Sequence, residues 1–217
     1  MIYNIYKPIG WTSFDVVKKI RSITKVKKVG HGGTLDPFAE GVLIVGIGRG
    51  TKTLSSVSSQ HKSYQAIIQL GSETDTFDNE GNIINRVSVP KLDKSYISNV
   101  LNSFLGEYDH TPPMYSAKKI NGTPLYKLAR QNIIVDREPV RSTIFDIHLN
   151  DFSSDLINFS VTCSKGTYIR VLGSDIAKKL QTVGHLIKLI RTSVGEYEVS
   201  SSQSIENFEN LWKSSEI

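Results

Sequence analysis

The feature that most constrains the fold of this chain is a run of small and bend-forming residues around one acid, Asp36. The run covers residues 30–41, GHGGTLDPFAEG, and an apolar stretch at 42–47 follows it directly. Glycine permits backbone conformations that other residues rarely adopt, and Pro37 restricts both itself and the residue before it. Asp36 is therefore predicted in a stiff loop just before a buried strand. Such loops often carry catalytic residues, although an ordinary Asp-Pro turn has the same local pattern.

Charge along the chain is distributed unevenly. The 217 residues include 26 Lys and Arg against 21 Asp and Glu, which gives a net charge of +5. Two basic segments, 1–35 and 165–191, flank a more acidic middle that contains Glu73, Asp75, Asp78 and Glu80. This pattern predicts a one-sided surface for a polyanion such as RNA. The alternative is that the basic residues lie on ordinary solvated helix faces.

Several classes of protein do not fit the sequence. No apolar run approaches the roughly 18 residues of a membrane-spanning helix, and the start, MIYNIYKPIG, resembles neither a signal peptide nor a transit peptide. We therefore expect a cytoplasmic protein. The sequence implies no protein partner, and a monomer is expected. The single cysteine, Cys163, excludes an internal disulfide and a multi-cysteine zinc site. Residues 46–52 do not have phosphate-loop spacing and residues 71–81 do not fit an EF-hand, so no cofactor and no metal are expected.

Apolar periodicity predicts a mixed α/β fold. Ser13 is a candidate N-cap for a helix with Phe14, Val17 and Ile20 on its apolar face. A second helix is expected at 92–105, and a third leads from Arg170 to Leu180. Strands are expected at 62–71, 140–152 and 156–163, the last two as a hairpin.

The segment 30–52, GHGGTLDPFAEGVLIVGIGRGTK, resembles the catalytic motif of the TruB family. These are bacterial tRNA pseudouridine synthases that act on the uridine at position 55, in the T loop. The resemblance implies that Asp36 is the essential catalytic residue. Residues 7–13, a Lys-Pro-x-Gly followed by Trp-Thr-Ser, are similar to the family's amino-terminal motif, which packs beside the catalytic loop and is mainly structural.

Later motifs of the resemblance imply further substrate-binding residues. A Lys-x-Tyr strand places an active-site tyrosine at Tyr64, and residues 163–170, CSKGTYIR, place a tyrosine and an arginine at Tyr168 and Arg170, expected on one strand face. Residues 184–191 match the last shared motif, in which Leu189 would lie beside the flipped base. Ordinary core packing is the alternative for Leu189. The first of the two basic residues that usually follow this leucine is here an isoleucine, which weakens any RNA contact assigned there. His31 would fill the space that the base leaves, or hold the flipped nucleotide.

The resemblance also implies a domain organisation and a reaction. The expected fold is a pseudouridine synthase fold, with a central, mainly antiparallel sheet flanked by helices. A catalytic domain is expected over 1–199, with a tRNA-gripping insertion at about 106–131, which is aromatic and basic. Residues 200–217 are expected to form a short tail without a separate RNA-binding domain. The reaction would be isomerisation of uridine by Asp36, which either attacks C1′ or removes a sugar proton. The alternative from another class is a tRNA-binding folding chaperone without catalysis.

Overall fold

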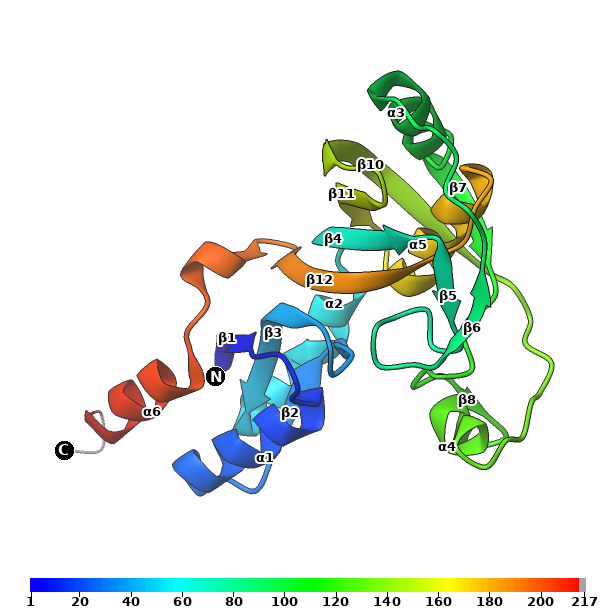
Figure 1. Ribbon diagram of the computed structural model, residues 1–217. Helices are drawn as coiled ribbons and strands as arrows, with labels where there is room; N and C mark the ends of the chain where they lie inside the picture. Colours follow the sequence, from blue (N-terminus) through cyan, green and yellow to red (C-terminus); the bar gives the residue numbers. More distant parts are fainter. Residues whose placement is uncertain (215–217) are drawn as a thin grey trace. The chain divides into compact units, whose positions relative to one another are not determined.

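The protein forms two compact units (Figure 1). The computed structural model describes residues 1–214. Unit 1 comprises Met1–Gln65 and Leu189–Ile217, and unit 2 comprises Ala66–Lys188. Two strands, β4 (Lys62–Leu70) and β12 (Gly184–Val194), contribute residues to both units.

Unit 1 is built around strand β3 (Glu40–Ile47). β1 (Ile2–Lys7) and β2 (Val29–Gly32) both pair antiparallel with β3, and β12 pairs in parallel with its first two residues. The other elements of this unit are α1 (Ser13–Thr24), the 3-10 helix η1 (Gly48–Thr53), α2 (Leu54–Ser59), β13 (Tyr197–Glu198), the 3-10 helix η2 (Val199–Ser201) and α6 (Ile205–Ser214).

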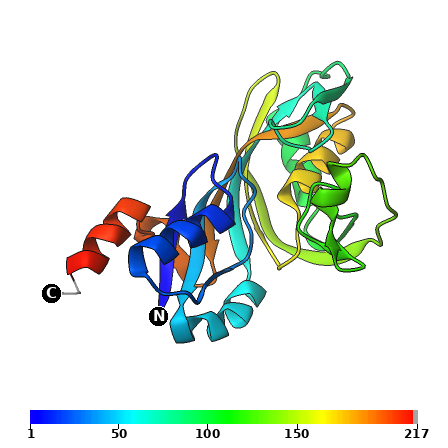
Figure 2. The same ribbon diagram turned by 90° about the horizontal axis from the view of Figure 1, so that it is seen from below.

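Both faces of β3 are covered, which explains why its sequence is apolar without alternation. Successive side chains point to opposite faces, so the strand contributes to two separate cores. Figures 1 and 2 show the ribbons of β3, α1 and α2 from two directions. The core on the α1 side includes Ile5, Val17, Ile20, Leu43 and Val45. The core on the α2 side consists of Val42, Ile44, Leu54, Val57 and Val194.

The start of α1 differs from the prediction. The N-cap is Thr12, whose hydroxyl accepts a hydrogen bond from the amide of Asp15 at 3.0 Å, and the carboxylate of Asp15 accepts one from the amide of Thr12 at 2.9 Å. This reciprocal pair is a capping box. It provides hydrogen-bond acceptors for two amides at the start of the helix that have no acceptor within the helix itself. The prediction of Ser13 was wrong because its hydroxyl is buried and binds the loop that carries Asp36.

Unit 2 contains a mainly antiparallel sheet in the order β12-β4-β11-β10-β7. β10 (Val140–Phe152) and β11 (Leu156–Cys163) form the predicted hairpin, and β7 (Gly106–His110) pairs antiparallel with β10. The other elements are β5 (Ser72–Thr74), β6 (Ile83–Arg86), α3 (Lys94–Asn102), β8 (Lys119–Ile120), β9 (Thr123–Pro124), α4 (Leu125–Ala129) and α5 (Ile169–Lys179). The predicted mixed α/β class and mainly antiparallel pairing are confirmed.

The segment expected to grip tRNA, about 106–131, has two structural parts. Its first residues form β7, which belongs to the sheet, and the remainder contains the β8–β9 hairpin and α4. Within residues 1–214, no helix is long and apolar enough to cross a membrane.

Candidate active site

Asp36 lies in the loop between β2 and β3, in a turn closed by its own carbonyl. The amide of Ala39 donates to the carbonyl of Asp36 at 3.1 Å, and Pro37 occupies the second position of this turn. Proline is favoured there because its φ is already set. The flanking Leu35 and Phe38 are buried while Asp36 itself is half-buried, so the apolar neighbours anchor the turn.

The amino-terminal motif holds this turn from one side. The Lys7 ammonium is fully buried and donates to the carbonyl oxygens of Trp11 at 2.6 Å and Pro37 at 3.3 Å. The amide of Gly10 donates to the same Pro37 carbonyl at 2.8 Å. Residues 7–13 therefore lie beside the loop of Asp36, as predicted, and a mainly structural role for them stays a prediction.

A second contact comes from the first turn of α1. The hydroxyl of Ser13 accepts a hydrogen bond from the amide of Leu35 at 2.8 Å and donates to its carbonyl at 3.1 Å. Both backbone groups of the residue before Asp36 are thus satisfied by one buried side chain. The turn has backbone bonds to separate elements on either side of its acid, which restricts where the carboxylate can lie.

His31 lies in β2 opposite Val45 and is half-buried. Burial lowers the pKa of His31 below its ordinary value, and the nearby positive charge of Arg191 lowers it further. The imidazole is therefore neutral at pH 7. Its buried Nδ1 has no hydrogen-bond partner among the described residues, so this atom is left with unused bonding capacity.

Two other predicted site residues of unit 1 have buried side chains. Tyr64, in β4, is 9% exposed and lies on the same strand face as Lys62 and Ala66. Leu189, in β12, is 4% exposed. Burial of Leu189 agrees with the core-packing alternative, and its contact with a base stays a prediction.

Tyr168 and Arg170 belong to unit 2 and do not share a strand face as predicted. Tyr168 is the N-cap residue of α5, and Arg170 lies in the first turn of that helix. The strand prediction was wrong because β11 ends at Cys163 and a turn follows. The ring of Tyr168 meets the ring of the buried His110 edge-on, with 5.9 Å between their centroids.

Arg170 is held by a set of contacts that the sequence did not reveal. Its guanidinium donates to the carbonyl oxygens of Thr76 at 2.6 Å and Tyr115 at 2.7 Å. Nη1 also lies 3.4 Å from Oδ2 of Asp78, an ion pair in which both side chains are 5% exposed or less. The amide of Glu80 donates to Oδ1 of Asp78 at 3.0 Å and fixes the carboxylate. From the sequence, the acids at 71–81 were considered only as calcium ligands. The ion pair of Asp78 with Arg170 was not predicted, because the two residues are far apart in the chain.

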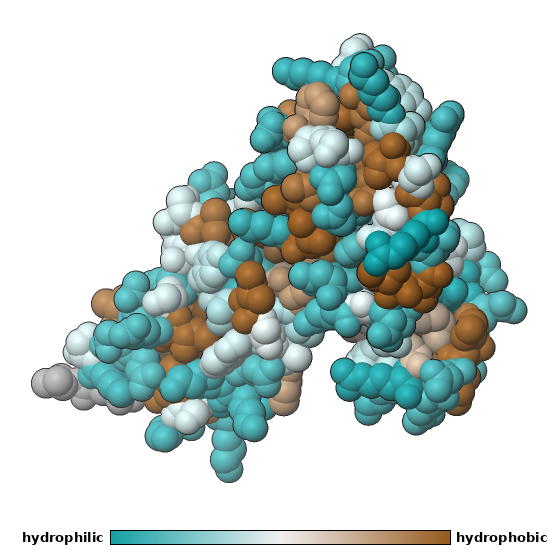
Figure 3. Space-filling view, viewed as in Figure 1, coloured by the Kyte–Doolittle hydropathy of each residue, from teal (hydrophilic) through white to brown (hydrophobic). Residues whose placement is uncertain are grey.

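The basic residues of segment 18–28 in unit 1 fall into two groups, those that contact other parts of the protein and those that form no ion pair. Arg21 donates to the carbonyl of Val29 at 2.8 Å, and Lys19 forms an ion pair with Glu209 at 3.3 Å. Within residues 1–214, no ion pair involves the exposed lysines of this segment, Lys18, Lys25, Lys27 and Lys28. The face shown in Figure 3 is largely hydrophilic around α1.

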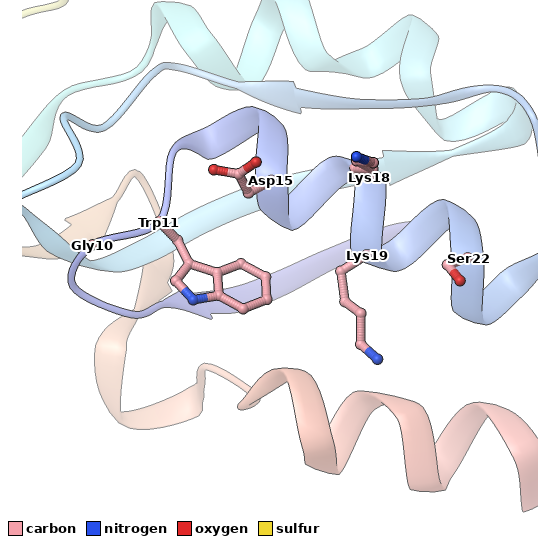
Figure 4. A pocket seen from close by; sticks show the side chains of 6 residues that line it. All are labelled: Gly10, Trp11, Asp15, Lys18, Lys19 and Ser22. Carbon is pink, nitrogen blue, oxygen red and sulfur yellow. The ribbon is translucent and has the colours of Figure 1, made fainter.

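A surface pocket of about 440 Å³ lies on α1 of unit 1. Its lining includes the indole of Trp11 and the side chains of Lys18 and Lys19 (Figure 4). The same lining contains the side chain of Asp15, so the pocket is of mixed charge. Within the part of the chain that the structure describes, no group of three or more His, Cys, Asp or Glu side chains is placed to hold a metal ion.

Comparison with known proteins identifies the family of enzymes to which this chain is similar. A model described as "TruB family pseudouridylate synthase (N terminal domain)" matches residues 21–169. The chain is 43% identical to tRNA pseudouridine synthase B of Clostridium tetani over 97% of its length and 73% of that protein. It is 44% identical to the protein of the same name from Clostridium kluyveri, over 98% of this chain and 74% of that one.

Solved structures agree on the fold. The chain superposes with a TM-score of 0.78 on a chain of a Cbf5-Nop10-Gar1 complex, at 26% identity, covering 100% of this chain and 56% of that one. For a chain in the structure of an H/ACA RNP bound to a substrate RNA containing 2′-deoxyuridine, the TM-score is 0.74 at 24% identity, with 100% and 55% covered.

The fold and these matches define a pseudouridine synthase, an enzyme that isomerises uridine to pseudouridine. The chain belongs to the TruB family of these enzymes. The family and the enzyme class predicted from the sequence are confirmed.

Proposed function

We propose that the protein converts the uridine at position 55 of the tRNA T loop to pseudouridine, with Asp36 as the catalytic carboxylate. The observation that carries this proposal is the bracing of the Asp36 turn. Lys7 and Ser13 hold the backbone on either side of Asp36, which is half-buried. Reaction at a sugar carbon needs a carboxylate fixed within a fraction of an ångström. The names of the two Clostridium relatives support tRNA as the substrate.

The reaction rearranges bonds within one nucleotide. The C1′–N1 bond breaks, a C1′–C5 bond forms, C5 loses a proton and N1 gains one, so no redox partner is needed. A carboxylate can act as a nucleophile at C1′ or as a base towards a sugar proton. The target base must leave its stack, at a cost of a few kcal/mol.

Five other residues are proposed to bind the substrate. Tyr64 would stack on the extruded uracil and Leu189 would lie beside it. His31, which is neutral, would fill the space left by the base or hold the flipped nucleotide. Tyr168 and Arg170 are proposed to contact the target nucleotide from α5.

We infer that the T arm of tRNA is bound by one copy of the chain, in the cytoplasm. The exposed lysines of residues 18–28 would supply phosphate contacts. Such contacts give affinity without sequence specificity and weaken as salt rises.

The test is to incubate the protein with a tRNA transcript and measure pseudouridine at position 55, with a transcript carrying cytidine there as control. We expect one pseudouridine per wild-type transcript. Asp36→Asn keeps the side-chain shape and removes the charge, so turnover should fall by at least about 10⁴-fold while the Kd for tRNA stays within about twofold. Activity of Asp36→Asn within about tenfold of wild type would remove Asp36 from its role. Binding without product by the wild-type protein would favour the chaperone alternative.

A further inference from the structure

Arg191 is a buried cation beside the Asp36 loop that the sequence motif does not explain. It is the second residue after Leu189, a position where a basic residue suggests an RNA contact. Its side chain is 1% exposed, so the guanidinium is sealed inside unit 1. A group this deeply buried does not meet a phosphate at the surface.

The hydrogen bonds of this guanidinium within residues 1–214 go to the backbone on either side of Asp36. Nε donates to the carbonyl of Val42 at 2.7 Å, Nη2 to that of Gly33 at 3.1 Å, and Nη1 to that of Thr34 at 3.4 Å. Gly33 and Thr34 precede the turn and Val42 follows it. One side chain therefore ties together the two ends of the catalytic loop.

The backbone of Arg191 contributes to the same arrangement. Arg191 and Ile190 pair in parallel with Gly41 and Glu40, the residues that lead out of the loop. The position of β12 thus fixes where the loop ends, and the side chain of Arg191 fixes where it begins. A loop held at both ends by one residue has little freedom to shift.

The choice of arginine fits this role. A guanidinium presents five donors in a rigid plane, so it can satisfy carbonyl groups that lie in different directions, whereas an ammonium is a compact point charge on a flexible stem. Among the residues that the structure describes, no carboxylate forms an ion pair with Arg191. Burial of an unpaired charge is unfavourable, and an apolar side chain would avoid that penalty.

We propose that Arg191 is a positioning residue for catalysis: it sets the geometry of the Asp36 loop from inside unit 1 and does not contact RNA. This inference rests on the proposed role of Asp36 as the catalytic carboxylate. A displacement of about 1 Å at a reacting group can lower a rate by about 100-fold. The effect should therefore appear in the chemical step and leave RNA affinity unchanged.

The experiment compares Arg191→Lys with wild type and with Ile20→Val, a core substitution in α1 that destabilises unit 1 without touching the loop. Three quantities are measured: the single-turnover rate at saturating tRNA, the Kd for tRNA as a function of salt, and hydrogen exchange at the amides of Leu35 and Ala39. For Arg191→Lys we expect a rate about 10- to 100-fold lower, a Kd within about twofold of wild type, and faster exchange at both amides. Arg191→Met, which retains no donor, should be slower still.

Ile20→Val should lower the melting temperature and leave the single-turnover rate and both loop amides as in wild type. A rate for Arg191→Lys within about twofold of wild type would overturn the proposal. So would a weaker Kd with the log–log salt slope reduced by about 1 in magnitude, since that marks a lost phosphate contact. Hydrogen exchange can be measured without enzymatic activity, so it tests the proposal even if Asp36 is not catalytic. Unchanged exchange at the amides of Leu35 and Ala39 in Arg191→Lys would refute the claim that Arg191 holds the Asp36 loop.

Discussion

Replacement of Gly41 by alanine tests the close packing at the exit of the Asp36 loop. Gly41 has φ +104°, and a Cβ there would lie 2.3 Å from the carbonyl oxygen of Arg191 and 3.0 Å from its amide nitrogen. These atoms belong to the backbone of the paired strand and cannot rotate away. Relief of the clash requires the strands to separate by roughly 1 Å, which would break the parallel pairing of β12 with β3.

The expected cost follows from two contributions. A positive φ at a residue with a side chain costs about 1–2 kcal/mol, and overpacking against fixed atoms costs about 1–3 kcal/mol. The sum, about 2–5 kcal/mol, is a large part of the stability of a typical domain. Gly48→Ala is the matched control, because Gly48 also has positive φ, +58°, but no heavy atom lies within 4 Å of the position that a Cβ would take there. The control should lose only about 1 kcal/mol.

Urea unfolding followed by tryptophan fluorescence measures both variants. The chain has two tryptophans, Trp11 and Trp212, and both belong to unit 1, so the signal reports the unit that contains Gly41. The effect of alanine on the unfolded chain is common to both variants and cancels in the difference. Equal losses for Gly41→Ala and Gly48→Ala, within about 0.5 kcal/mol, would refute the claim that the backbone of Arg191 excludes a side chain here.

Two further predictions concern buried charge and pH. Asp78→Asn leaves Arg170 buried without this carboxylate and should lower the free energy of unfolding by about 3 kcal/mol; circular dichroism in urea checks this, and a loss below about 0.5 kcal/mol would show that the ion pair is unimportant. His31 should titrate below 6.5 by NMR. As the pH falls, His31 then binds its proton in the unfolded chain before it does so in the folded protein. The free energy of unfolding therefore keeps its full value above pH 6.5 and decreases between pH 6.5, the pKa in the unfolded chain, and the lower pKa of the folded protein. His31→Gln should flatten this part of the stability profile, and an unchanged profile would count against a depressed pKa.

Local patterns in the sequence predicted much of the secondary structure. The hairpin of β10 and β11 has the predicted bounds, because alternation of apolar residues and a polar turn are both local signals. The helix expected at 92–105 is α3, shortened at each end. The capping box of Thr12 and Asp15 was also visible in the sequence, since the two residues are three apart, and could have replaced Ser13 as the predicted cap.

Partners that are distant in the chain could not be predicted. Arg170 binds the carbonyl of a residue 94 positions earlier, and Arg191 binds one 149 positions earlier. No periodicity in one sequence encodes which buried guanidinium meets which carbonyl. The resemblance to a family drew attention to the Asp36 loop and placed residues 7–13 beside it. The individual hydrogen bonds from Lys7, Ser13 and Arg191 to this loop are visible only in the tertiary structure.

Unit 1 is built from two segments that are separated in the sequence, and this has a consequence for biosynthesis. Unit 2 is inserted between residues 65 and 189, so β12 is made long after β2 and β3. The 149 residues from Leu43 to Arg191 take roughly 7–30 s to translate at about 5–20 residues per second. During that interval the nascent Asp36 loop has neither the guanidinium nor the neighbouring strand that completes it. A ribosome-bound chain stopped before residue 191 should therefore be inactive, and activity should appear only once β12 has emerged.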